Sequence, residues 1–223
     1  MIDTHHLFYG TLGYFLGSIP SGYIFGKLVL NKDISITGST TIGAANVFRL
    51  SSLKLGVVVF LIDSLGKGLI PLLLISVLTK PSLFFEYANI FTLSALIGHN
   101  WSIFLKFKGG RGQSLIIGSL IILSTPLTII MLFTLFTTWL IFKDGGPSWL
   151  TTLFILMITC VTSITITNNL PLTISIIMYL IITLIKRITA NKSIKESKIN
   201  NNSPIKTILL YRLILDRDVP ERS

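Results

Sequence analysis

The chain has 223 residues, of which 51% are hydrophobic and 13% are charged, and its mean hydropathy is +0.76. Ordinary soluble domains carry about 25% charged residues, so this composition indicates a membrane protein and excludes collagen-like, disordered and disulfide-scaffold classes. The net charge of +10 fits anionic lipid headgroups, phosphorylated ligands and basic cytoplasmic loops better than it fits nucleic acid.

Six apolar stretches follow one another, and a membrane-spanning helix needs about 20 such residues. No basic segment precedes the first stretch, so we expect it to be a retained span rather than a signal peptide. The fourth stretch is too long for one upright span and contains Pro126, which predicts either one kinked helix or two helices. The stretches are Leu7–Leu30, Leu53–Leu78, Tyr87–Leu105, Leu115–Phe142, Trp149–Ile166 and Leu170–Ile185.

The distribution of Lys and Arg favours two helices in the fourth stretch. Basic residues concentrate in segments 31–54 and 106–111, at Lys143, and in the tail from Lys186, which holds nine Lys/Arg and four Asp/Glu. Cytoplasmic loops are the basic ones, and only an odd number of spans places all four segments on that side. We therefore predict an all-α integral membrane protein with seven transmembrane helices, its N-terminus outside and its C-terminus in the cytoplasm.

The sequence divides into a polytopic membrane domain, residues 1–190, and a basic cytoplasmic tail, residues 191–223. Residues 191–203 are polar and indicate a linker. Residues 205–215 carry apolar side chains at helical spacing beside basic ones, which favours a short amphipathic helix on the membrane surface. A disordered tail is the alternative interpretation. The apolar positions are Ile205, Ile208, Leu209 and Leu213.

Four polar clusters interrupt the apolar stretches, and two of them lie inside predicted helices. Residues 17–22, Gly-Ser-Ile-Pro-Ser-Gly, fall in the first helix, where they form either a small-residue packing face or the wall of a cavity. In the second helix Asp63 and Lys67 are four residues apart and share one face. They form either a structural ion pair or part of a functional site, because ionisable groups are costly at membrane depth.

The other two clusters have the composition of anion-binding loops. Residues 38–49 combine glycines, hydroxyls and an amide with Arg49, which can bind phosphate oxygens bidentately. Residues 108–112, Lys-Gly-Gly-Arg-Gly, lead into a helix and follow His99, so backbone amides and two cations could hold a phosphate there. The spacing is not that of a Walker loop. A polar loop at the membrane edge and a structural histidine are the alternatives.

No GxSxG nucleophile motif is present in the sequence, and the spacing of its His, Cys, Asp and Glu residues does not suggest a metal site. The four clusters, in this order, resemble the bacterial acyl-phosphate:glycerol-3-phosphate acyltransferases of the PlsY family. The resemblance covers residues 7–191. The matching segments are GSIPSGYIFGK at 17–27, DI at 33–34, GSTTIGAANVFR at 38–49, DSLGKG at 63–68 and GHNWSIFLKFKGGRG at 98–112.

The resemblance implies transfer of a fatty acyl group from acyl phosphate to the sn-1 hydroxyl of glycerol 3-phosphate, giving lysophosphatidic acid and phosphate. This is the first step of phospholipid synthesis. It implies a bacterial inner-membrane enzyme with a cytoplasmic active site, needing membrane lipids but no cofactor, metal or nucleic acid. The catalytic residues it implies are Ser39, His99, Arg111 and Asn191. The substrate-binding residues are Gly38, Gly43, Asn46, Arg49, Lys108, Gly109, Gly110 and Gly112.

This chain departs from the family pattern at a few positions. Thr40 and Thr41 stand where the family pattern GSGNxGATN has Gly and Asn, and Arg111 stands where Lys is usual. Ile188 replaces the His of the late pattern RHxxNIxRL, whereas Arg187 and Asn191 match it. These departures motivate an alternative hypothesis, in which a catalytically weakened paralogue binds a membrane lipid or a phosphate ligand.

Overall fold

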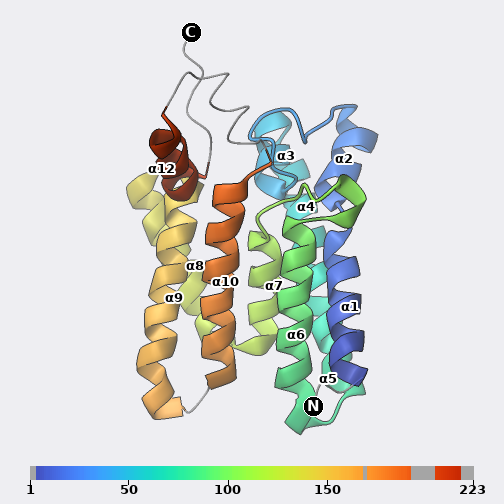
Figure 1. The fold of residues 1–223 in the computed structure, drawn as a ribbon, viewed down its shortest axis with the longest axis vertical. Coiled ribbons are helices and arrows are strands. Elements are labelled where there is room, and N and C mark those ends of the chain that lie inside the picture. The colour runs from blue at the N-terminus through green and yellow to red at the C-terminus, as the bar shows by residue number, and fades with distance from the viewer. Residues whose placement is uncertain (1–3, 168–169, 192–203, 217–223) are drawn as a thin grey trace. The chain divides into compact units, whose positions relative to one another are not determined.

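The computed structural model describes residues 4–167, 170–191 and 204–216, and within these ranges all regular structure is helical. The chain forms two compact units, residues 1–128 and residues 129–223, which are described separately below. The boundary falls inside α8 (Thr125–Phe142). Figure 1 shows the helices of both units. The predicted linker at 191–203 lies outside the described residues except for Asn191.

In unit 1 the first apolar stretch is two helices, α1 and α2. We predicted that residues 17–22 lie inside one helix, and this was wrong, because α1 ends at Ser18 and α2 begins at Ser21. Pro20 has no N–H to donate and disfavours a helical conformation at Ile19, so the chain breaks there. The helices are α1 (Thr4–Ser18), α2 (Ser21–Leu30), α3 (Ala44–Leu50), α4 (Leu53–Ser64), α5 (Ile70–Leu78), α6 (Pro81–Asn100) and α7 (Gln113–Leu123).

The closest helix pair in unit 1 is α1 and α6, which run side by side in Figure 1. Small residues allow this approach: a Cβ added at Gly13 or Gly17 would overlap the carbonyl oxygen of Phe91 or Ala95. Such glycine contacts are typical of helix packing inside membranes, where backbones come close without large side chains between them. The α1–α6 pair therefore fixes the end of α1 beside the end of α6.

A π-helical segment, η1 (Leu65–Leu69), joins α4 to α5. Gly68 in this segment lies against the backbone of α7, and Gly118 of α7 lies against the backbone of Ser64. A π segment inserts an extra residue into the helix and rotates the side chains around it. Here it carries Lys67, which is buried inside unit 1.

The fourth apolar stretch is broken close to Pro126, so the predicted kink or break is present. Helix α7 ends at Leu123, Ser124 has an extended conformation (φ −164°, ψ 99°), and α8 begins at Thr125. Pro126 occupies the first turn of α8, where its missing N–H costs nothing. The stretch is therefore two helices rather than one.

Unit 2 contains most of α8 together with α9 (Gly145–Thr167), α10 (Leu170–Thr189) and α12 (Ile205–Leu215). A helix was predicted at 205–215, and α12 has these bounds. It packs on α9 and α10 through Ile208 and Arg212, both of which are buried. Its placement on a membrane surface stays a prediction.

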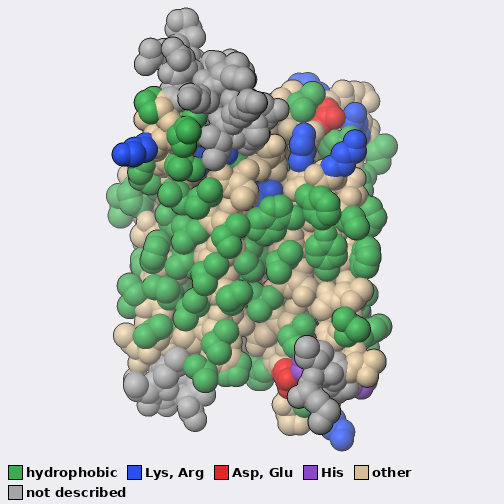
Figure 2. All heavy atoms as spheres, viewed as in Figure 1, with side chains coloured by type: hydrophobic (Ala, Val, Ile, Leu, Met, Phe, Trp, Pro, Cys, Tyr) green, Lys and Arg blue, Asp and Glu red, His purple; other side chains and the backbone are tan. Residues whose placement is uncertain are grey.

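The surface of the protein is apolar over most of its helices, as an integral membrane protein requires. Within the described residues, four helical segments are long and apolar enough to cross a bilayer: Leu53–Leu78, Thr125–Phe142, Gly145–Thr162 and Leu170–Thr189. Val77 is 82% exposed and Ile141 is 74% exposed, which in water would be unfavourable. In Figure 2 hydrophobic side chains cover the sides, and Lys and Arg of unit 1 gather mainly at its α2–α3 end.

Candidate active site

The loop between α2 and α3 is organised by Asn46, whose side chain is fully buried. Its Oδ1 accepts a hydrogen bond from the backbone N–H of Ser39 at 2.9 Å. Its Nδ2 lies 2.9–3.0 Å from the carbonyl oxygens of Ile34, Thr37 and Thr41. The sequence predicted that Asn46 binds substrate. The amide is instead directed into the loop, where it fixes the position of Ser39.

Two residues of this loop adopt left-handed backbone conformations. Gly38 has φ +64°, and Thr40, where the family pattern expects glycine, has φ +56°. A β-branched residue is strained there, since its Cβ crowds the backbone. Between them, the Ser39 hydroxyl lies 2.8 Å from the hydroxyl of Thr41. The departure at Thr40 thus places a strained residue in this loop.

The second loop, residues 101–112, folds back over the end of α6. The N–H of Gly110 donates to the carbonyl of His99 at 3.0 Å, and the N–H of Ser102 donates to that of Lys108 at 3.2 Å. A Cβ at Gly110 would overlap Nε2 of the His99 ring, and one at Gly109 would overlap backbone carbonyls of α6. These two glycines are therefore required for the loop to lie directly on the histidine.

The predicted cations lie at the surface around these loops. Arg49, in the last turn of α3, and Lys108 are exposed, and Arg111 is partly buried. Gly43 precedes α3 with nothing within 4 Å of its Cβ position, so the space beside it is open. Gly112 has φ +70° and lies at the start of α7. The cations are thus accessible to an anionic ligand in solution or in the headgroup region.

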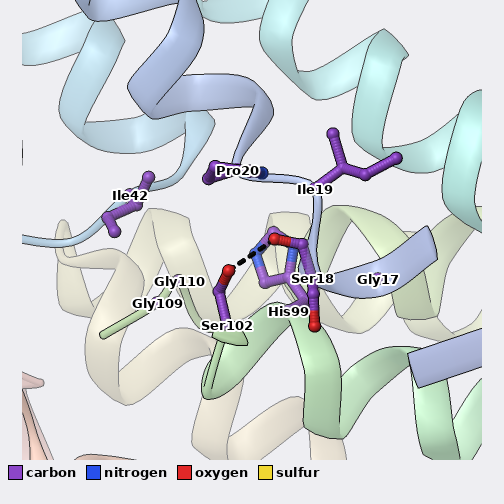
Figure 3. A pocket seen from close by; sticks show the side chains of 9 residues that line it. All are labelled: Gly17, Ser18, Ile19, Pro20, Ile42, His99, Ser102, Gly109 and Gly110. Atoms are coloured by element: carbon purple, nitrogen blue, oxygen red, sulfur yellow. Dashed lines mark hydrogen bonds between the residues drawn. The ribbon is translucent and has the colours of Figure 1, made fainter. Parts of the chain in front are cut away.

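A small, open pocket, with room for about one water molecule, brings three of the four sequence clusters together (Figure 3). His99, Gly109 and Gly110, all predicted site residues, line it. The Ser102 hydroxyl donates to the carbonyl of Ser18 at 2.5 Å and joins the end of α1 to the second loop. The other lining residues are Gly17, Ser18, Ile19, Pro20, Ile42 and Ser102.

The remaining cluster, Asp63 and Lys67, contacts the Nδ1 side of His99. The predicted pairing of Asp63 with Lys67 is present, with Nζ 2.6 Å from Oδ1, and both side chains are buried. Lys67 also lies 3.4 Å from Nδ1 of His99. The sequence singled out Asp63 and Lys67 but placed neither in the site. The sequence did carry a hint, namely two ionisable residues inside an apolar helix.

Asn191 belongs to unit 2, at the end of α10, where its Oδ1 accepts a hydrogen bond from Lys186 Nζ at 3.0 Å. The preceding motif residue, Arg187, is fully buried and donates to the carbonyl of Gly146 at 2.6 Å and to that of Leu213 at 2.5 Å. Arg187 therefore ties α10 to α9 and α12. Ile188, the last of the four departures, accepts a hydrogen bond from Arg212 at its backbone carbonyl, at 3.1 Å.

The model of the family described as glycerol-3-phosphate acyltransferase matches residues 7–196. The chain belongs to this family. A glycerol-3-phosphate acyltransferase of Prochlorococcus marinus (strain MIT 9515) is 36% identical over 192 residues, which cover 85% of this chain and 95% of the relative. One of Ehrlichia chaffeensis is 38% identical over 148 residues, covering 66% and 73%.

Two solved structures of a family member are similar to this fold. The crystal structure of PlsY (YgiH), an integral membrane glycerol 3-phosphate acyltransferase, in its glycerol 3-phosphate form has a TM-score of 0.71 and 26% identity. It covers 82% of this chain and 88% of that one. The lysophosphatidic acid form has a TM-score of 0.69 and 25% identity, with 82% and 87% covered. The resemblance found from the motifs is thereby confirmed.

Proposed function

We propose that this protein transfers a fatty acyl group from acyl phosphate to the sn-1 hydroxyl of glycerol 3-phosphate, giving lysophosphatidic acid and inorganic phosphate. The observation that carries the proposal is the pocket in which the α1–α2 break, the α2–α3 loop and the glycine loop meet at His99. The substrate and product forms of the related crystal structure support it. Nothing in the comparisons supports a binding protein without activity.

The roles of the residues follow from the charges of the two substrates. Both carry phosphate, so their approach needs cations, which we assign to Arg49, Lys108 and Arg111. Ser39, His99 and Asn191 orient the acceptor and the reacting phosphate. The hydroxyl oxygen of glycerol 3-phosphate attacks the acyl carbon, the bond from that carbon to the phosphate oxygen breaks, and the hydroxyl proton leaves with the phosphate. Phosphate is a good leaving group, so no protein nucleophile is required.

The remaining predicted glycines and Asn46 act on the site indirectly. Asn46 and Gly38 shape the loop that presents Ser39, and Gly109 and Gly110 let the second loop reach His99. Gly43 leaves open space in front of α3, and Gly112, which is buried and has φ +70°, lets the chain turn from the second loop into α7. We propose that Ser39 and the three cations of unit 1 face one cytoplasmic cavity.

The proposed enzyme crosses a bacterial inner membrane seven times, with its N-terminus outside and its active site facing the cytoplasm. The crossings are α1, α4 to α5, α6, α7, α8, α9 and α10. The Lys and Arg side chains at the α2–α3 end of unit 1 support this orientation (Figure 2). Helix α7 has 11 residues, about 16 Å, which is shorter than the roughly 30 Å hydrocarbon core of a bilayer.

The orientation is tested by cysteine labelling of sealed vesicles in a Cys160→Ser background. Lys206→Cys, on α12, is expected to label only from the cytoplasmic side. Lys80→Cys, between α5 and α6, is the matched control and is expected to label only from outside. The reverse pattern, or labelling of both positions from one side, would refute the seven-span arrangement.

The reaction is tested with purified protein in lipid nanodiscs supplied with glycerol 3-phosphate and one acyl donor. Acyl phosphate is expected to give lysophosphatidic acid and phosphate in equal amounts, and acyl coenzyme A is expected to give neither. Arg49→Gln is expected to raise the KM for glycerol 3-phosphate, whereas Lys54→Gln, an exposed lysine outside the clusters, leaves it unchanged. Folded protein that releases no phosphate above background would overturn the proposal.

A further inference from the structure

Two irregular backbone segments lie next to the Nδ1 side of His99, and Lys67 contacts both Ile19 and His99 there. One is the break between α1 and α2 at Ile19 and Pro20, and the other is the π segment Leu65–Leu69. At the break the carbonyl of Ile19 accepts from the N–H of Ser21 at 3.0 Å, and the π segment carries Lys67 toward it, so that Nζ also donates to this carbonyl at 2.6 Å. A lysine at this depth is held by specific polar groups rather than by solvent.

Lys67 makes more contacts than an ion pair needs. Its Nζ lies 2.6 Å from Asp63 Oδ1, 3.1 Å from the Ser21 hydroxyl and 3.4 Å from His99 Nδ1. The Ser21 hydroxyl donates in turn to Asp63 Oδ1. Asp63 is 1% exposed and Lys67 is 3% exposed, so this network lies inside the protein. A purely structural pair would neutralise its charge without a contact to the histidine.

The contact with Lys67 determines which nitrogen of His99 carries the proton. The ammonium group of Lys67 has three N–H donors for four neighbouring acceptors, so Ser21 and His99 share one donor; because the group has no acceptor, the ring nitrogen that faces it is favoured in its unprotonated form. In the neutral imidazole the proton then lies on Nε2. That atom faces the second loop, because a Cβ at Gly110 would overlap it.

We propose that Lys67 is a positioning residue, which holds His99 in the Nε2–H tautomer and directs this N–H toward the glycine loop. In this form Nε2 donates a hydrogen bond and cannot take up a proton. Resting on the proposed function, His99 is thus a donor to a substrate phosphate oxygen and not a general base.

The tautomer is tested directly by nitrogen NMR of the intact protein with ¹⁵N-labelled histidine in nanodiscs, in alkaline buffer where histidine is neutral. The chain has three histidines, and His99→Gln identifies the resonances of the third. The parent protein is expected to show a protonated Nε2 and an unprotonated Nδ1 at His99. Lys67→Met is expected to shift this pattern toward exchange between the tautomers, whereas Lys67→Arg, still a donor, preserves it. Lys80→Met, at an exposed lysine, is the control.

Removing Lys67 alone leaves the Asp63 carboxylate buried without its cation, which can prevent folding. The double variant Asp63→Asn with Lys67→Met removes both charges and keeps the test available. It is expected to show the same tautomer exchange as the single variant, and a kcat about 10²-fold lower with little change in KM.

A parent protein whose His99 carries the proton on Nδ1 would overturn the inference, as would a double variant whose His99 spectrum is unchanged. Both results come from the NMR spectrum and do not require the protein to catalyse the reaction. An inactive parent with the expected tautomer would therefore refute the proposed function alone, and an active parent with the other tautomer would refute this inference alone.

Discussion

Thr40→Gly is expected to stabilise the protein, although it removes a side chain. Thr40 has φ +56°, a conformation that costs an L-residue about 1–2 kcal/mol and that glycine adopts freely. Glycine also gains freedom in the unfolded chain, which offsets about 0.4–1 kcal/mol of this benefit. The net expectation is a stabilisation of about 0.5–1 kcal/mol.

The prediction is measured as the unfolding midpoint of the protein in detergent micelles. A gain of about 1 kcal/mol corresponds to about 2–4 °C for a chain of this size. Thr40→Asn is expected to fall between the parent and Thr40→Gly, because Asn tolerates the left-handed region. Gly38→Ala, at φ +64° and with its Cβ overlapping Asn46 Oδ1, is the opposite control and is expected to lower the midpoint.

Two results would refute this reasoning. One is a midpoint for Thr40→Gly that equals or falls below that of the parent. The other is an equal gain with Thr40→Ala, since alanine keeps the Cβ that is strained in this conformation. Either would mean that the side chain, and not the backbone, determines the contribution of Thr40 to stability.

Three further variants probe other parts of the two units. Gly110→Ala places a Cβ on the neighbouring imidazole and is expected to lower kcat about 10²-fold in the acyl phosphate assay; Gly66→Ala, with open space around it, is the control, and equal activities would refute the packing argument. Arg212→Gln is expected to weaken the docking of α12 by about 1–3 kcal/mol, measured as faster amide hydrogen exchange; unchanged exchange would contradict this. The Ser35 hydroxyl donates a hydrogen bond to Asp33 and holds the pKa of this carboxyl below its usual value. The Asp33 carboxylate therefore stabilises the fold at pH values above its unfolded-state pKa, and this contribution is lost as the pH falls through its lower, folded-state pKa. An NMR titration in which Ser35→Ala leaves the pKa of Asp33 unchanged would refute this cause.

Local chemistry was sufficient to predict several features of the fold. Pro126 predicted an interruption in the fourth stretch, and the spacing of Asp63 and Lys67 predicted their pairing. The apolar pattern at 205–215 predicted α12 to the residue. Each of these depends on residues within a few positions of one another, where helix geometry and the missing proline N–H decide the outcome.

Features that depend on tertiary contacts were not predictable from the sequence. From the sequence we placed Pro20 inside one helix, because a proline alone does not show whether a helix kinks or ends at that point. The π segment exists where Gly68 packs against α7, a contact between residues about fifty positions apart. The inward direction of the Asn46 amide likewise depends on the path of the loop around it. Composition identified the site clusters, whereas only the packing shows that Lys67 contacts His99.

The arginine at the end of α10 also constrains the order in which unit 2 can be built. Arg187 finds carbonyl partners 26 and 27 positions further along the chain, at Leu213 and Ile214. A ribosome delivers α10 to the membrane before those carbonyls exist. Until then Arg187 has the earlier carbonyl of Gly146 as an acceptor but lacks those of α12, so the hydrogen bonds of its buried guanidinium are complete only when α12 packs on α9 and α10. Closure of unit 2 around Arg187 thus waits for the last helix of the chain.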